Sequence, residues 1–338
     1  MTPADNDYGG CGSCTFAAGA TPTTCTSARS VNACCDYVQS PPSTGITLSS
    51  NLHYFSAPPG DTTPDLGCLT SPGTVGTPAM VTLTGYVKLF ANGDDSQGVK
   101  IDIFKEGTDG ALGASVATYT TTTMDPSVVE TWSSQCPTAG CNLREFSIPD
   151  VPSNTKLIIQ TSDATGSGLW GDVYDYNIFI TDPPAKFGTA DSNCKTGPCY
   201  NPIAVAATDI NSVAAAAIGA SINPTQGVLA GEVHDCGDIR LSGATVDTDQ
   251  PHEGPMFYFD DTEDDPLPDD TRQASDEGTS SLGLFGALDL PTGVPVRISA
   301  TGFYQGKLTL LGTYVVQIFP GAVTALSLRG RGAFQTSP

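Results

Sequence analysis

Three consecutive residues, His234, Asp235 and Cys236, carry an imidazole, a carboxylate and a thiol. These groups are common ligands of transition metals, and they transfer protons or act as nucleophiles in enzymes. The same residues also suit a polar turn between two strands, where exposed polar side chains cost little. The sequence lacks the G-x-S-x-G and H-E-x-x-H motifs of hydrolases. We therefore expect no catalytic residues, although two suitably placed carboxylates suffice for glycoside hydrolysis.

A second candidate site is the acidic stretch FDDTEDDPLPDDTRQASDEG, from Phe259 to Gly278, whose one basic residue is Arg272. Carboxylates crowded into a loop repel one another unless solvent or a cation neutralises them. The D-x-D-x-D-G spacing of an EF-hand is missing, so we expect a solvated acidic loop, with Ca²⁺ ligation as the alternative. The candidate calcium ligands are Asp260, Asp261, Glu263, Asp264, Asp265, Asp269 and Asp270.

The aromatic residues Trp170, Tyr174 and Tyr176 lie close together beside Asp172 and Asp175. Rings that stack on sugars, next to carboxylates that bond hydroxyls, are typical of carbohydrate-binding faces. Alternation along this stretch favours core packing for the tyrosines, whereas Trp170 precedes the strand and is expected to be exposed. Trp170 and Tyr174 are the candidate binding residues.

Eleven cysteines indicate an oxidising compartment and predict disulfides rather than idle thiols. Cys136 and Cys141, and likewise Cys194 and Cys199, flank four-residue turns with Pro and Gly, so each pair is predicted to close locally. The pairing of the others stays open, with zinc as the alternative at the first C-x-x-C: they are Cys11, Cys14, Cys25, Cys34, Cys35, Cys68 and Cys236. Because the count is odd, Cys236 is either a free thiol or a tether to the N-terminal segment.

The composition of the 338-residue chain limits its partners. Hydrophobic residues make up 39%, which is enough for a core, and the formal net charge is -22. The few lysines and arginines form no cluster, which excludes nucleic acid and anionic membranes as partners. No apolar run approaches the roughly 20 residues of a transmembrane helix. We expect a secreted or cell-surface protein, whose export signal is absent from this sequence, that binds surface or matrix proteins or polysaccharide.

The chain repeats itself over about 95 residues, with conserved order and spacing of the shared stretches. LTGYV at 83–87 recurs as LAGEV at 229–233, and GVKID at 98–102 recurs as GATVD at 243–247. FSIPDVPSNTKLII at 146–159 recurs as FGALDLPTGVPVRI at 285–298, and YDYNIFI at 174–180 answers TYVVQIF at 313–319. Each stretch alternates apolar and polar residues, as strands with one face on a core do.

The predicted fold is mainly β, with two tandem antiparallel β-sandwiches joined by one helix and preceded by a Cys-rich loop segment. The disulfide-stapled segment covers 1–75, and the sandwiches cover 76–185 and 225–331. The linker, 186–224, holds a helix at about 202–218, for which Asn201 is the expected N-cap and Gly219 lies just past the end. The abundant alanines predict close packing of this helix against a sandwich.

The second repeat resembles the carboxypeptidase regulatory-like domain, a transthyretin-like β-sandwich. The resemblance rests on Leu229, Gly231, Val233, Gly243, Ala244, Val246, Phe285, Leu290, Pro291, Gly293, Val296, Ile298, Ala300 and Gly302. The first repeat departs from it, with Val99 in place of Ala and Asn154 in place of Gly. The resemblance implies two tandem accessory modules of a bacterial-type secreted or surface protein, and it implies no shared catalytic set.

The counterpart of the His234 segment in the first repeat, GYVKLFANGDDSQGVKI, keeps the Gly, the Val and the turn but has no His and no Cys. This favours a polar turn over a metal or catalytic site. We therefore expect a non-enzymatic structural or adhesion protein without cofactors, able to form homo-oligomers or assemblies through its sandwich edges. The alternatives are a carbohydrate-binding, lectin-like protein that uses Ca²⁺, and an enzyme of unrecognised type.

Overall fold

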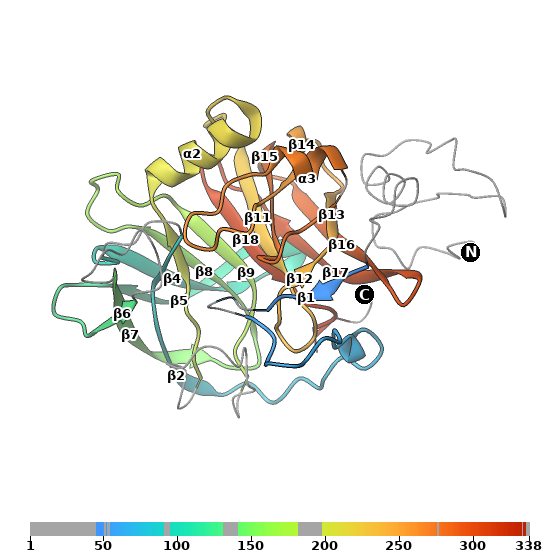
Figure 1. Ribbon diagram of the computed structural model, residues 1–338. Helices are drawn as coiled ribbons and strands as arrows, with labels where there is room; N and C mark the ends of the chain where they lie inside the picture. Colours follow the sequence, from blue (N-terminus) through green and yellow to red (C-terminus); the bar gives the residue numbers. More distant parts are fainter. Residues whose placement is uncertain are drawn as a thin grey trace.

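The computed structural model describes residues 45–50, 52, 55–90, 95–130, 141–181, 198–275, 277–332 and 334–335, and the chain is mainly β (Figure 1). Up to the end of the first repeat the strands are β1 (Thr47–Leu48), β2 (Met80–Tyr86), β3 (Lys88–Phe90), β4 (Val99–Glu106), β5 (Leu112–Thr120), β6 (Ser127–Glu130), β7 (Cys141–Pro152), β8 (Lys156–Asp163) and β9 (Val173–Phe179). The later strands are β10 (Ile203–Val205), β11 (Gly227–Val233), β12 (Leu241–Ser242), β13 (Thr245–Thr248), β14 (Glu253–Tyr258), β15 (Leu284–Leu290), β16 (Pro295–Tyr304), β17 (Lys307–Gln317) and β18 (Val323–Leu328). The helical elements are η2 (Gly67–Leu69), η3 (Thr108–Gly110), α2 (Ala207–Ile218) and α3 (Asp270–Ser275).

One eight-stranded sheet runs through both repeats, in the order β14-β15-β11-β18-β9-β8-β4-β5 (Figure 1). Two three-stranded sheets, β2-β7-β6 and β13-β16-β17, complete the two halves. The halves join where β18 pairs with β9, and this pair is parallel, as is the neighbouring pair of β11 with β18. The mainly β prediction is confirmed, but the expectation of purely antiparallel sheets is wrong at this join.

The internal repeat is confirmed by strand register. Gly85 on β2 pairs with Phe146 on β7, and the equivalent Gly231 on β11 pairs with Phe285 on β15. Both strand pairs are antiparallel, and both shift register at the same point, between Val81 and Leu83 and between Gly227 and Leu229. The two segments therefore share the irregularities of their backbone as well as their hydrophobic pattern.

The turn between the equivalent strands β7–β8 and β15–β16 also has the same backbone in both repeats. Asp150 and Asp289, which align, have φ of 59° and 55°. Asn154 has φ of 49° where Gly293 has φ of 75°. Asn tolerates this left-handed conformation better than most residues with a side chain. The departure of the first repeat at Asn154 thus preserves the turn.

The shared sheet has a hydrophobic core on each face. On β8, Leu157 and Ile159 belong to the core of the first repeat, whereas Ile158 between them packs into the core of the second. Successive side chains on a strand point to opposite faces, so the two cores lie on opposite faces of the sheet. Tyr176 on β9 likewise packs with the second repeat, which ties the halves into one body.

The helix α2 begins at Ala207, five residues later than predicted. Ile203–Val205 instead forms β10, which pairs with β3, and Asn201 Oδ1 accepts a hydrogen bond from the Tyr86 N–H at 2.9 Å. The predicted end is confirmed, because Gly219 has φ of 68° and its N–H donates to Ala215. The helix packs its apolar side on strands of the shared sheet, as its alanines predicted. No helix in the described ranges is long and apolar enough to cross a membrane.

Candidate functional site

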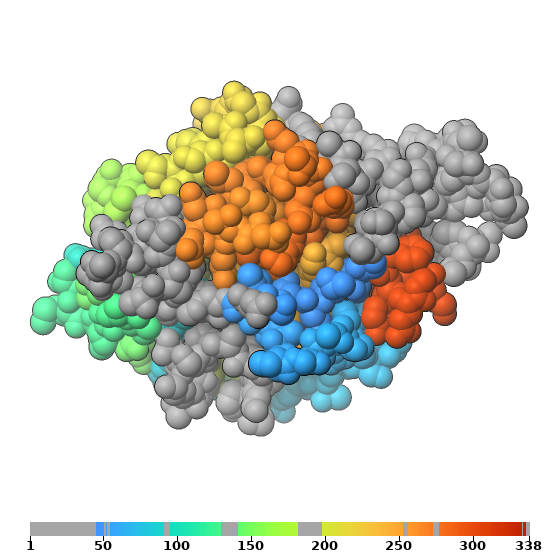
Figure 2. All heavy atoms as spheres, viewed as in Figure 1, coloured from blue at the N-terminus to red at the C-terminus, as the bar shows by residue number. Residues whose placement is uncertain are grey.

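The acidic stretch forms a closed loop and a short helix on the surface of the second repeat, where Figure 2 shows it in orange between α2 (yellow) and the segment just after residue 45 (blue). Phe259 bridges to Pro268, and the Asp260 N–H donates to the Leu267 carbonyl at 2.9 Å. The helix α3 follows at once. The loop therefore has a defined backbone that fixes where its carboxylates point.

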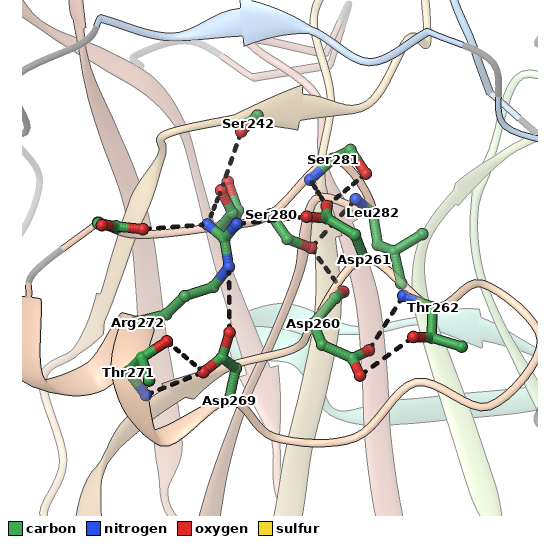
Figure 3. Close-up of polar contacts among 12 residues, drawn as sticks. Ser242, Asp260, Asp261, Thr262, Asp269, Thr271, Arg272, Ser280, Ser281 and Leu282 are labelled. Carbon is green, nitrogen blue, oxygen red and sulfur yellow. Dashed lines mark hydrogen bonds and ion pairs between the residues drawn. The ribbon is translucent and has the colours of Figure 1, made fainter.

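Arg272 on α3 lies at the centre of this loop (Figure 3). Its guanidinium is 3.5 Å from Asp261, 3.7 Å from Asp269 and 4.0 Å from Glu277. Its Nη1 also donates to the carbonyls of Gly278 and Thr279. Three carboxylates thus face a cation supplied by the chain itself.

Hydroxyl and amide donors occupy the remaining oxygens of these aspartates (Figure 3). The Thr271 hydroxyl donates to Asp269 at 2.6 Å, and this bond lowers the pKa of that carboxyl. Burial opposes the charged form of Asp261, but bonds from the Ser281 N–H and hydroxyl outweigh it and lower the pKa. Local hydrogen-bond donors therefore favour the charged form of these carboxylates.

Of the seven predicted calcium ligands, the structure brings Asp261 and Asp269 together at Arg272 and directs Glu263 away, to Arg240 at 2.7 Å. Asp260 accepts bonds from Thr262. Within the described ranges, no group of three or more His, Cys, Asp or Glu side chains is placed to hold a metal ion. Calcium ligation by the seven residues therefore stays a prediction.

His234 is buried, with 1% of its surface exposed, and both of its ring nitrogens face carboxylates. Nε2 lies 2.6 Å from Glu232 and Nδ1 lies 2.7 Å from Asp238. Burial alone would lower the pKa of His234, but the bonds to Asp238 and Glu232 outweigh it and raise the pKa. The predicted strand, polar turn and strand are present, but His234 itself is buried between two carboxylates, whose bonds favour the charged form of its ring.

The network continues from His234 through two arginines. Arg240 donates to Glu232 at 3.0 Å and to Glu263 at 2.7 Å, and Arg329 lies 3.1 Å from Asp238. The set contains three carboxylates and three cations, so its charges balance. We call these six residues the buried ion cluster; they are Glu232, His234, Asp238, Arg240, Glu263 and Arg329. It links β11, the turn after it, the acidic loop and the segment after β18.

The other two residues of the His-Asp-Cys run fix the segment that precedes β2. Asp235 accepts bonds from the N–H groups of Asp65, Gly237 and Ile239, all at 2.8 to 2.9 Å. Cys236 forms a disulfide with Cys68, 168 residues away in the sequence. Cys236 is therefore the predicted tether and not the odd thiol. The three neighbours each serve the fold, and they do not converge on one point.

Two further cysteines, Cys141 and Cys199, are also disulfide-bonded. Their predicted partners, Cys136 and Cys194, lie outside the described residues, so the two local pairs stay predictions. The remaining predicted disulfide positions also lie outside the described residues; they are Cys11, Cys14, Cys25, Cys34 and Cys35.

Of the two aromatic candidates, Trp170 is buried and Tyr174 is partly buried. Trp170 is 7% exposed, packs in the first core and donates through Nε1 to the Gln97 carbonyl at 3.3 Å. The expectation that Trp170 is exposed is wrong. Tyr174 stacks on Phe319 with ring centroids 3.8 Å apart, and its hydroxyl accepts a bond from Gln160. The Trp170 ring is therefore not available to a sugar, and Phe319 covers one face of the Tyr174 ring.

Sequence reasoning did not single out one buried pair, Asp175 on β9 and Tyr200 before β10. The Tyr200 hydroxyl donates to Asp175 Oδ2. Burial raises the pKa of Asp175 to about 7, although the bond from Tyr200 opposes the shift. The available signal was the position of Asp175 between Tyr174 and Tyr176 on a strand that is covered on both faces.

Comparison with protein families gave no matching family model, and comparison with curated proteins gave no matching sequence. The resemblance to carboxypeptidase regulatory-like domains therefore rests on the residues that carry it. The function is argued below from the geometry of this chain.

Proposed function

We propose that this chain is a non-enzymatic structural or adhesion module of an extracellular or cell-surface assembly. One observation carries the proposal: the side chains best suited to chemistry form a buried ion cluster with balanced charges. Both nitrogens of His234 are bonded to carboxylates, so the ring has no nitrogen left for a metal or a substrate proton. Such a cluster holds segments together rather than turning over a substrate.

The disulfides support export. Cys68 and Cys236 are paired, and Cys141 and Cys199 are disulfide-bonded. Disulfides of this kind persist in secreted and surface proteins and are rare in reducing compartments. The disulfide between Cys68 and Cys236 closes a long loop, and a disulfide stabilises the fold more when the loop is longer. This supports a role outside the cell, where a protein needs a stable fold.

The carbohydrate-binding alternative loses its main support in the burial of Trp170 and the stacking of Tyr174 on Phe319. The calcium alternative is weakened by Arg272, which already neutralises Asp261 and Asp269. Surface or matrix proteins are therefore the partners that this proposal favours over sugars.

The test is a binding assay with the full chain on immobilised matrix proteins and polysaccharides, with Ca²⁺ and with a chelator. We expect saturable binding to a surface or matrix protein, unchanged by the chelator and without turnover of the bound material. Turnover of the bound material by the folded chain would contradict the proposal and make the chain an enzyme. Binding to polysaccharide that the chelator abolishes would establish the lectin-like alternative instead.

A further inference from the structure

The strand β5 forms one end of the eight-stranded sheet. In the described part of the chain this nine-residue strand pairs with β4 alone, regularly from Ala117 to Thr120 and with register shifts before Ala117. Leu112, Gly113, Ala114 and Ser115 are exposed, and so are Thr118 and Thr120. An edge strand of this length presents a row of backbone donors and acceptors to solvent.

Hydrogen bonding just beyond the strand shows which backbone groups face outward. The Thr121 N–H donates to the Val99 carbonyl, and the Thr121 carbonyl accepts from the Gly98 N–H, so Thr121 faces β4. Backbone groups of alternate residues point to opposite sides of an antiparallel strand. The N–H and C=O groups of Thr118 and Thr120 therefore point away from the sheet.

Other strand edges of comparable length are covered. The outer side of β2 is occupied by the segment 198–201, where Thr84 exchanges backbone bonds with Pro198 and Tyr200. The opposite end of the large sheet, β14, contacts α2 and α3. On the outer side of β17, the Gly330 N–H donates to the Leu311 carbonyl. The strand β5 also packs against β7, but in the described part of the chain no strand is hydrogen-bonded to its outer edge.

The stretch 111–124, ALGASVATYTTTTM, contains no charged residue, in a chain of net charge -22. It also lacks the Lys and Pro residues with which natural edge strands prevent pairing, and it is rich in Thr, Val and Tyr, which favour strands. The nearest acids are already bonded: Asp102 lies 2.7 Å from Lys100, and Asp125 accepts from Tyr119. Two copies can therefore approach here without the repulsion that their charge imposes elsewhere.

We propose that two copies of this chain pair through the outer edges of β5, antiparallel and about a two-fold axis. Antiparallel pairing places the same strand opposite itself, so one edge complements its copy, as a two-fold interface requires. The exposed side chains of Leu112 and Met124, at 36% and 90%, lie at the two ends of this stretch. The shared sheet would then continue across both copies. This pairing needs only the exposed edge, and it does not rest on the proposed function.

The test is sedimentation velocity of the full chain over a wide concentration range. Thr120→Pro removes an outward N–H without removing a bond to β4. Thr118→Lys places a charge on the edge, in place of a hydroxyl that donates to Asp102. Thr63→Lys, at an exposed residue far from β5 in the sequence, is the matched control. We expect the wild type and Thr63→Lys to dimerise, and each edge variant to raise the dimer Kd at least about tenfold.

Hydrogen exchange gives a second readout, because the Thr118 and Thr120 amides should gain protection as the concentration rises. If Thr120→Pro does not fold, Thr118→Lys carries the comparison. A wild type that stays monomeric at every concentration would overturn the proposal. So would a dimer that both folded edge variants retain unchanged.

Discussion

The Tyr314 hydroxyl, in the second repeat, lies 2.6 Å from Oε2 of Glu106, in the first. Lys156 Nζ lies 2.7 Å from the other oxygen of Glu106, whose side chain is 1% exposed. Nearby, the Tyr176 hydroxyl donates to Gly110, and Gln317 donates to Asp109. The bonds of Tyr314 and Gln317 join the end of β4 and the turn after it to β17, so they hold the two repeats together.

Removing the Tyr314 hydroxyl should weaken this junction. Tyr314→Phe leaves a buried carboxylate oxygen without its donor, so we expect the free energy of unfolding to fall by about 1–3 kcal/mol. Tyr304→Phe is the control, because the second core packs against Tyr304 without burying it fully. Urea denaturation measures both. Equal losses in the two variants would show that the Glu106 bond contributes nothing.

Gly330 lies against the disulfide between Cys68 and Cys236. A Cβ at Gly330 would be 2.1 Å from Cys68 Sγ, whereas a Cβ at Gly306 would meet nothing within 4 Å. Both glycines have positive φ, at 65° and 74°, so substitution by Ala strains the backbone at both. We expect Gly330→Ala to lower the melting temperature clearly more than Gly306→Ala. Similar melting temperatures would mean that the C-terminal segment does not pack on the disulfide.

The buried Asp175 predicts a pH dependence of stability. Burial raises its pKa to about 7, above the ordinary value of an unfolded aspartate near 4. Between these values the folded state binds more protons than the unfolded state, so the contribution of Asp175 is present below about pH 4 and is lost towards pH 7. Asp175→Asn should flatten the fall in the free energy of unfolding across this window. An unchanged slope would contradict a protonated Asp175.

Arg272 gives a prediction for the acidic loop. Arg272→Gln leaves Asp261, Asp269 and Glu277 without their shared cation, so we expect a lower melting temperature that Ca²⁺ partly restores. The wild type should melt at the same temperature with Ca²⁺ and with a chelator. A melting temperature that the chelator lowers in the wild type would show that the loop already uses a metal.

The sequence predicted much of the fold through its repeat. Alternation in LTGYV and LAGEV located β2 and β11, and the alignment of the two repeats paired Asn154 with Gly293, which have the same left-handed backbone. The join of β18 with β9 could not be predicted, because hydrophobic alternation does not say which edges meet. The late start of α2 was missed because Asn201 and Pro202 suit a helix start, while Asn201 here bonds the backbone of Tyr86.

The candidate site was predicted less well than the fold. His234 lies at a strand end, where local patterns indicate exposure, but distant segments bury it. The ring of Phe55 lies over it, with its centroid 5.0 Å from that of His234. Arg329, from the C-terminal segment, binds Asp238, which is a partner of His234. Trp170 was misjudged for the same reason, since its indole meets Gln97 from another part of the first repeat. Burial by remote segments leaves no local signal.

The central claim is that the buried ion cluster is structural, with a charged His234 between Glu232 and Asp238. Its most direct test is the ¹⁵N NMR spectrum of the histidine side chains, with the His234 signals assigned by their loss in His234→Gln. We predict that both ring nitrogens of His234 carry protons at neutral pH, and that neither zinc nor a chelator moves them. A singly protonated ring at neutral pH, or shifts that follow added metal, would contradict the account.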